Sequence, residues 1–121
     1  FFMLKFITGR TKAIYYSIKG AFHLVKTEHS IQAQLFISLF FVLAGFYFNL
    51  SNIEWLFVVL AISLVLTAES LNSAIEKMAD FIHPDYNKKI GLIKDIAAGA
   101  VFFAFLFAFA VICVIYIPKI Y

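Results

Sequence analysis

Four polar side chains share one face of a predicted helix in the stretch ESLNSAIEKMAD. Glu69, Asn72, Glu76 and Asp80 follow one another at intervals of three, four and four residues. At 100° per residue they fall within about 80° of arc on an α-helix. Carboxylates aligned in this way can take a proton as a general base or hold a divalent cation through oxygen.

A long apolar run precedes this acidic stripe and sets the solvent in which it works. The chain of 121 residues is 64% hydrophobic and only 14% charged, with a mean hydropathy of +0.94. Soluble domains are about 25% charged. We therefore predict an all-α integral membrane protein, with residues 1–121 as a single domain. Its membrane spans are expected at about residues 31–48, 53–81 (including a cytoplasmic extension) and 95–117.

A further helix is predicted before the first span, at about residues 10–28. Apolar residues recur there every three or four positions, and lysines recur every seven positions on the opposite face. This pattern is typical of a helix that lies on a membrane surface with its lysines toward anionic headgroups. The apolar residues are Ile14, Ile18, Ala21 and Val25, and the lysines are Lys12, Lys19 and Lys26.

Positive charge is distributed unevenly around the predicted spans. Lysine and arginine precede the first span and follow the second, whereas the turn NLSN between these two spans has neither. By the positive-inside tendency, the N-terminus and the loop after the second span are cytoplasmic, in a multi-pass membrane protein. The formal charge of +3 thus indicates orientation in a membrane, and we predict no nucleic-acid partner.

The acidic stripe is expected to cross the cytoplasmic boundary of the membrane. A helix that enters the hydrocarbon at the start of the second span crosses about 30 Å in about 20 residues and leaves near Asn72. No helix breaker follows until Pro84, so the helix continues into the cytosol. Glu69 would then lie just inside the boundary, and Glu76 and Asp80 would lie outside it.

Carboxylates graded in depth across this boundary suit the phosphorylation of a lipid alcohol. The acceptor hydroxyl is held at headgroup level, while ATP arrives from water with Mg²⁺. Glu69 would take the hydroxyl proton, carboxylates further out would hold Mg²⁺, and Lys94 would neutralise the transferring phosphoryl group. The familiar glycine-rich nucleotide loops are absent from the sequence, so such a kinase would be of an unusual kind.

Two other interpretations of the stripe stay open. Carboxylates and an asparagine on one helix face also suit an ion or proton relay in a small transporter subunit, although the midplanes of the spans hold nothing ionisable. The same groups could form polar contacts between helices of a noncatalytic assembly protein. In a structural role, Lys94 could pair with one of the carboxylates.

The sequence resembles the prokaryotic diacylglycerol kinase family, which includes diacylglycerol kinases and undecaprenol kinases. The resemblance rests on ESLNSAIEKMAD followed, after a short loop, by KDIAAGAV, and it extends to YSIKGAF and the Glu28 position. It covers nearly the whole chain. It implies a small homotrimer in the bacterial inner membrane, with active sites formed between protomers.

The resemblance also implies roles for individual residues. Glu69 is the general base at the lipid hydroxyl, Glu28 and Glu76 hold the metal-bound nucleotide, and Asn72 and Asp80 give polar support. Further contacts to ATP are implied for Tyr16, Asp85, Tyr86, Asn87, Lys94 and Asp95, and Arg10 stands one position from the family's N-terminal arginine.

The choice of acceptor is expected to depend on the third span. KTE before the first span and KDIAAGAV in the third resemble the undecaprenol kinase branch more than the diacylglycerol kinase branch, which has serine at the position of Ala98. One hydroxyl fewer beside the lipid headgroup fits an acceptor with a single alcohol. We therefore predict an ATP- and Mg²⁺-dependent lipid kinase that acts on undecaprenol, with diacylglycerol as the alternative acceptor.

Overall fold

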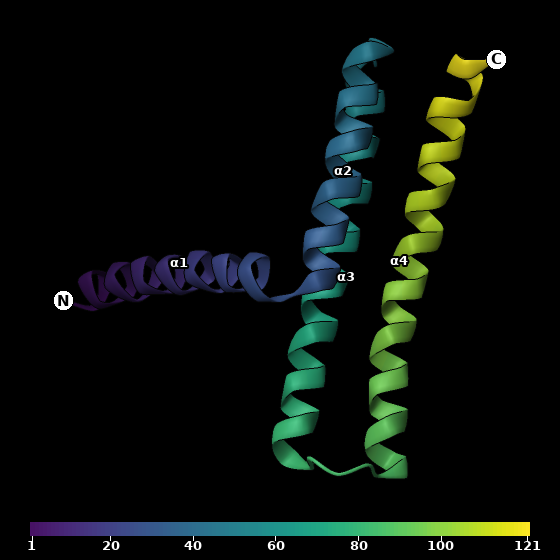
Figure 1. Ribbon diagram of the computed structural model, residues 1–121. Helices are drawn as coiled ribbons and strands as arrows, with labels where there is room; N and C mark the ends of the chain where they lie inside the picture. The colour runs from purple at the N-terminus through teal and green to yellow at the C-terminus, as the bar shows by residue number, and fades with distance from the viewer.

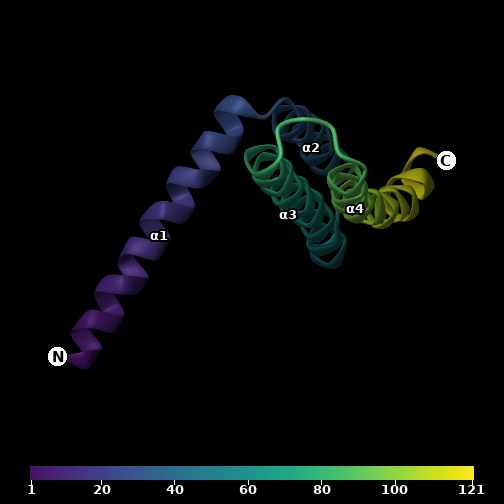
Figure 2. The ribbon, with the colours of Figure 1, turned by 90° about the horizontal axis from the view of Figure 1, so that it is seen from below.

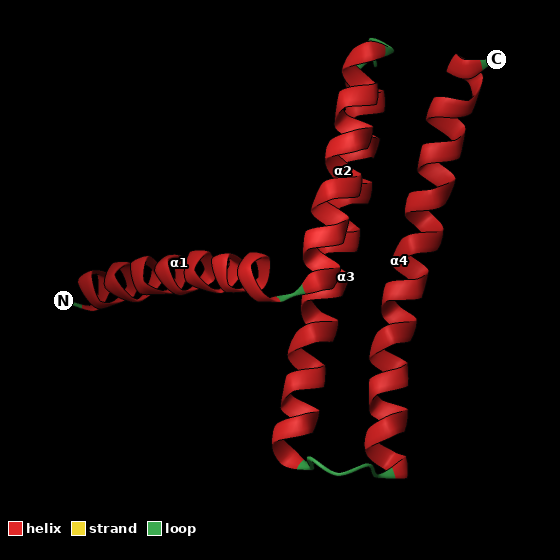
Figure 3. Cartoon of the chain, viewed as in Figure 1, coloured by secondary structure: helices red, strands yellow, loops and turns green.

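The computed structural model describes residues 1–121 as four α-helices without β-strands. Three helices form a bundle, and the first projects sideways from it (Figures 1 and 3). The predicted all-α architecture, with three helices long and apolar enough to cross a membrane, is confirmed. The helices are α1 (Phe2–Thr27), α2 (His29–Tyr47), α3 (Asn52–Ile82) and α4 (Lys88–Ile120).

The three bundle helices differ in length. The 19 residues of α2 rise about 28 Å, close to the thickness of a hydrocarbon core of about 30 Å. The 31 residues of α3 and the 33 residues of α4 rise about 46 and about 50 Å. Figure 1 shows that α3 and α4 extend together beyond the start of α2, at the end where residues 83–87 join them. We call this end of the bundle the loop end.

At the opposite end, a short turn joins α2 to α3. Asn49 adopts a φ of 54°, in the left-handed region that asparagine tolerates better than most residues. The Ser51 hydroxyl accepts a hydrogen bond from the Glu54 backbone N–H at 3.2 Å. The Glu54 carboxylate in turn accepts one from the Ser51 N–H at 2.9 Å. This capping box fixes the residue at which α3 begins.

The bundle is fastened at this turn end by α4. Leu50, Val58, Ile115 and Tyr116 form a buried apolar cluster. The Tyr116 hydroxyl donates a hydrogen bond to the backbone carbonyl oxygen of Phe41 at 2.6 Å, which joins α4 to α2. Lys119 Nζ lies 3.2 Å from Glu54 Oε2 and joins the last turn of α4 to the first turn of α3. We call this end of the bundle the turn end.

Most of the contact between helices lies between α3 and α4, which run side by side (Figures 1 and 2). Ala61 and Val65 of α3 are buried, as are Ala97, Val101 and Ala104 of α4. Small side chains at three- and four-residue intervals let two helix backbones approach closely. This packing holds the polar residues of α3 and α4 in a fixed register.

Helix α1 has no buried residue and extends away from the bundle (Figure 2). The sequence pattern predicts its start at about residue 10, whereas the helix begins at Phe2. It carries five lysine and arginine residues and no carboxylate. The helix ends because Glu28 is extended, with φ −97° and ψ 113°, and this residue redirects the chain into α2.

Candidate active site

Glu28 joins three helices at one point. It lies between α1 and α2, and its carboxylate reaches α3, 45 residues along the chain. Lys77 Nζ lies 2.8 Å from Glu28 Oε1, and the Ser73 hydroxyl donates to Glu28 Oε2 at 3.4 Å. The hydrogen bond from Lys77 holds the pKa of the Glu28 carboxyl below its ordinary value. Glu28 is therefore an ionised group docked against the acidic stripe, one helical turn from Glu69.

The members of the stripe differ in burial along α3. Glu69 is only 8% exposed and belongs to the face of α3 that also buries Val65 and Ser73. None of the three ion pairs of the chain includes Glu69. Its carboxylate also accepts no hydrogen bond from another residue of the chain. Glu76 and Asp80 are exposed. An unpaired carboxylate on a largely buried residue is thus followed by carboxylates of exposed residues toward the loop end.

Asn72 lies between these two groups and is half-buried. Its Nδ2 donates a hydrogen bond to Glu76 Oε1 at 3.4 Å. Its Oδ1 is buried and has no partner in the chain. Since buried polar atoms are nearly always hydrogen-bonded, this oxygen is available to a donor from outside the chain.

An apolar groove of about 420 Å³ runs between α3 and α4 beside Asn72. Small alanine side chains on α4 open it, and Thr67 and Asn72 are its polar lining groups. Ala98, the residue predicted to contact the lipid, is exposed on α4 outside this lining. The groove is lined by Leu64, Thr67, Ala68, Leu71, Asn72, Ile75, Ala97, Ala100, Phe103 and Ala104.

A polar pocket of about 300 Å³ lies at the loop end. The end of α3, the loop and the first turns of α4 contribute to it, and Lys94 Nζ lies 2.5 Å from Asp80 Oδ1 within it. The pocket brings Asp80, predicted to give polar support, together with five residues predicted to contact ATP. These five are Asp85, Tyr86, Asn87, Lys94 and Asp95.

Sequence-local interactions shape this pocket. Asn87 is the N-cap of α4, and its Oδ1 accepts hydrogen bonds from the backbone N–H groups of Lys89 and Ile90 at 2.9 and 3.4 Å. His83 Nδ1 lies 2.7 Å from the carbonyl oxygen of Asp85. The side-chain oxygen of Asn87 is therefore already engaged in starting α4, which leaves its amide nitrogen for a ligand.

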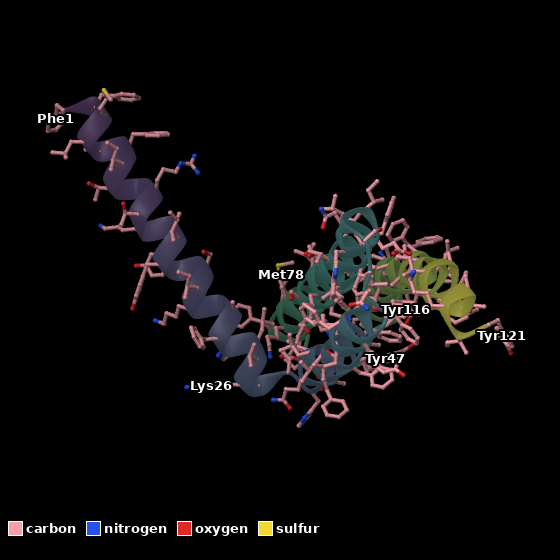
Figure 4. The ribbon with its side chains drawn as sticks, turned by 90° about the horizontal axis from the view of Figure 1, so that it is seen from above. Phe1, Lys26, Tyr47, Met78, Tyr116 and Tyr121 are labelled. Atoms are coloured by element: carbon pink, nitrogen blue, oxygen red, sulfur yellow. The ribbon has the colours of Figure 1, made fainter.

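Besides Glu28 and Glu76, two predicted nucleotide contacts lie outside this pocket, on α1. Arg10 and Tyr16 are exposed on α1, where Arg10 lies over the Phe6 ring at 5.3 Å and Tyr16 packs against Tyr15. Figure 4 shows α1, from Phe1 to Lys26, extending away from the bundle with its side chains on several sides of the helix. Within one chain, these two residues are not brought to the polar pocket.

Lys77 and Ser73, which hold Glu28, are site residues that the sequence pattern does not single out. Their spacing of four residues places them on one face of α3, which is a visible signal. Along the chain, Glu28 is 45 residues from Ser73 and 49 residues from Lys77. Helical periodicity carries no information about contacts at that separation. Only the return of α3 past the α1–α2 junction brings them together.

The carboxylates suit a metal that binds together with a nucleotide. The chain contains no group of three or more histidine, cysteine, aspartate or glutamate side chains positioned to hold a metal ion alone. Mg²⁺ is commonly held by one or two carboxylates, with phosphate oxygens and water completing its shell. The carboxylates of Glu28 and Glu76, which are predicted for this role, have the oxygen chemistry of such ligands.

Comparison with known proteins identifies the family. The profile of the prokaryotic diacylglycerol kinase family matches residues 15–116. The chain belongs to this family. The predicted resemblance and the predicted enzyme class, a lipid kinase, are thereby confirmed. Every predicted site residue except Arg10 lies within the matched region.

The names of the relatives of this chain give two different lipid alcohols as the acceptor. The chain is 29% identical to an undecaprenol kinase of Bacillus subtilis, over 90% of its own length and 89% of that protein. It is 28% identical to a diacylglycerol kinase of Haemophilus influenzae, over 74% of its own length and 75% of that protein. A diacylglycerol kinase of Helicobacter pylori is also 28% identical, over 78% of each chain.

Proposed function

We propose that this lipid kinase transfers the γ-phosphoryl group of ATP to the hydroxyl of undecaprenol, with diacylglycerol as the alternative acceptor. One observation carries the proposal. Glu69 is a residue only 8% exposed whose carboxylate has no partner in the chain, and it lies on a helix that borders an apolar groove on one side and a polar pocket at its end. A general base needs this freedom, because a carboxylate already paired would be a poor proton acceptor.

The position of α1 supports the proposed depth of Glu69. The ion pair and hydrogen bond of Glu28 fix the end of α1 at the level of Ser73 and Lys77 on α3. A basic helix of this kind, without a buried residue, would lie along the membrane surface. The boundary of the hydrocarbon then passes near Ser73, with Glu69 inside it and Asp80 in the cytosol.

The apolar groove between α3 and α4 would hold part of the lipid near the base. Its lining is apolar apart from Thr67 and Asn72, as expected for a site that binds a hydrocarbon chain and orients one polar group. The unpaired Asn72 Oδ1 would accept a hydrogen bond from the acceptor hydroxyl or from a water beside it. Asn72 Nδ2 would keep Glu76 oriented.

The reaction at this site needs one proton acceptor and several cations. Glu69 would accept the hydroxyl proton as the lipid oxygen bonds to the γ-phosphorus and the bond to ADP breaks. Lys94 would turn from Asp80 to the transferred phosphoryl group, where positive charge stabilises the transition state. Glu28 and Glu76 would hold Mg²⁺, which neutralises the phosphates of ATP when bound.

We further propose that the site is completed by a second protomer of a homotrimer. Arg10 and Tyr16 lie on the projecting helix, away from the polar pocket of their own chain (Figures 2 and 4). Large apolar side chains on all three bundle helices are exposed in the single chain. A neighbouring bundle would cover some of them and bring α1 to a pocket. The assembly would lie in the bacterial inner membrane, with its N-terminus and active site cytoplasmic.

Undecaprenol is favoured as the acceptor for two reasons. The relative named undecaprenol kinase matches 90% of the chain, a greater share than either diacylglycerol kinase. Ala98 also lacks the hydroxyl that would meet glycerol esters. Because Ala98 is exposed outside the groove, its contact with the lipid would arise at a protomer interface.

The proposal is tested with purified protein in lipid–detergent micelles, supplied with Mg²⁺, labelled ATP and either lipid alcohol. We expect labelled lipid phosphate, formed faster from undecaprenol than from diacylglycerol, and no label without Mg²⁺. Transfer to neither alcohol, together with proton or ion flux in vesicles, would contradict the proposal and favour the transporter interpretation.

A further inference from the structure

Lys77 has no part in the proposed reaction, yet it forms an ion pair with Glu28, whose carboxylate is proposed to bind the metal. Its ammonium lies 2.8 Å from Glu28 Oε1. It is also attracted by the neighbouring carboxylates of Glu76 and Asp80. A single side-chain cation therefore faces the same acidic groups that the proposed function assigns to Mg²⁺ and to the nucleotide site.

The two partners differ in their freedom to move. The Glu28 side chain is 20% exposed and is also held by the Ser73 hydroxyl, whereas the Lys77 side chain is 59% exposed. Lysine has a flexible stem and a well-hydrated ammonium group. Lys77 can therefore swing into water while Glu28 keeps its place, and an exposed ion pair of this kind contributes little free energy.

We infer that Lys77 is a resident counter-ion of the metal site, which pairs with Glu28 in the absence of nucleotide and is displaced when the metal–nucleotide complex binds. This inference rests on the proposed function, in which Glu28 and Glu76 hold the metal. Lys77 neutralises the charge of the Glu28 carboxylate in the resting protein. It also competes with the divalent cation and so sets the metal concentration at which the site fills.

A structural role for the same ion pair leads to the opposite expectation. If Lys77 only tied the α1–α2 junction to α3, its removal would loosen Glu28 and weaken metal binding. If Lys77 is a competing counter-ion, its removal strengthens metal binding. The sign of the change in metal affinity therefore separates the two roles.

The experiment is a double-mutant cycle read by electron paramagnetic resonance of free Mn²⁺. Full-length protein in detergent micelles is titrated with Mn²⁺ in the presence of a non-hydrolysable ATP analogue. We expect Lys77→Gln to lower the Kd for Mn²⁺ about threefold, the size typical of an exposed ion pair. In the Glu28→Gln background the same change lowers the Kd by less, because the carboxylate that Lys77 pairs with is gone and only its weaker attraction to Glu76 and Asp80 remains.

Matched variants complete the design. Lys77→Arg keeps the cation and is expected to bind Mn²⁺ no more tightly than the parent protein. Lys12→Gln removes an exposed lysine of α1 that forms no ion pair, and it leaves the Kd unchanged. Lys77→Met repeats the test should Lys77→Gln fail to fold.

Three outcomes would overturn the inference. They are weaker or unchanged Mn²⁺ binding in Lys77→Gln, an equal gain in both backgrounds, and absence of Mn²⁺ binding by the parent protein. The last outcome would also contradict the proposed metal site. A positive cycle in a protein that phosphorylates neither lipid would support the role of Lys77 and contradict only the proposed acceptors.

Discussion

The turn end and the loop end of the bundle treat their polar residues differently. At the turn end, the Glu54 carboxylate accepts a hydrogen bond from the Ser51 N–H and pairs with Lys119, and the Tyr116 hydroxyl is bonded to Phe41. Toward the loop end, the Glu69 carboxylate has no partner in the chain although the residue is only 8% exposed, and Asn72 has a buried, unbonded oxygen. Both ends lie on the same helix, α3.

This difference separates residues that hold the fold from residues held ready for a ligand. Leaving a buried polar atom unsatisfied costs about 1–3 kcal/mol, so such atoms persist where another molecule supplies the missing partner. Glu54 and Glu69 can be compared directly, because both are glutamates on α3. The Glu54 carboxylate has hydrogen-bond and ion-pair partners in the chain, and the Glu69 carboxylate has none. Substitutions at the two ends should therefore have opposite consequences for activity and for stability.

The largest expected effect follows from changing the two glutamates in parallel. Glu69→Gln keeps the size of the side chain and removes the base, so phosphoryl transfer to lipid should fall by about 10²- to 10⁴-fold. Glu54→Gln should retain activity and lower the thermal midpoint instead. Labelled-lipid assays and thermal unfolding of both variants in the same micelles provide the measurement. Equal losses of activity in the two variants would remove the distinction between the ends.

Lys94 should show the next largest effect. Lys94→Met removes the cation proposed for the transferred phosphoryl group, and kcat should fall by about 10²-fold, as for other groups that stabilise transition-state charge. The exposed Asp80–Lys94 pair contributes little to stability, so unfolding should be almost unaffected. A variant that loses stability and keeps its kcat would assign Lys94 a structural role.

Tyr116→Phe tests the turn end. The substitution removes the hydrogen bond between α4 and the Phe41 carbonyl and should cost about 1 kcal/mol of stability. Lipid phosphorylation at temperatures well below unfolding should be unchanged. The midpoint of thermal or denaturant unfolding measures the first effect, and kcat measures the second. An unchanged midpoint would show that this contact does not fasten the bundle.

The smallest expected effect concerns the acceptor. Ala98→Ser restores the hydroxyl found in the diacylglycerol kinase branch and should shift the ratio of kcat/KM values toward diacylglycerol by about threefold, the equivalent of one weak hydrogen bond. Competition between the two lipids in the same micelle measures this ratio directly. No shift, or a shift toward undecaprenol, would show that the residue at position 98 does not determine the choice of acceptor as proposed.

Local patterns in the sequence account for much of the fold. Apolar periodicity predicts the helices, and helical spacing places Glu69, Asn72, Glu76 and Asp80 in a line along α3, because both depend on residues within one or two turns. The pocket at the loop end is similarly predictable, since a short loop must return α4 beside α3 and so brings Lys94 to the end of the stripe.

Contacts between distant segments are not predictable in this way. The pairing of Glu28 with Lys77 depends on where α3 passes the α1–α2 junction, and no local pattern specifies that level. The positions of Arg10 and Tyr16 relative to the pocket depend on how chains assemble, which helical periodicity also does not specify. The start of α1 at Phe2 is not predictable from the sequence, because the amphipathic pattern is clear only from about residue 10.

The most direct test of the central claim is the depth of α3 in a bilayer. Nitroxide labels are introduced at Leu71 and Met78, two exposed positions on α3 that flank the level of Glu28, in a protein whose single cysteine, Cys113, is replaced by serine. Collision of a label with oxygen reports that the label is in lipid, and collision with a water-soluble nickel chelate reports that it is in water. We predict that Leu71 is in contact with lipid and Met78 with water. Equal depth at the two positions, with both in hydrocarbon or both in water, would contradict a site that joins a membrane alcohol to a dissolved nucleotide.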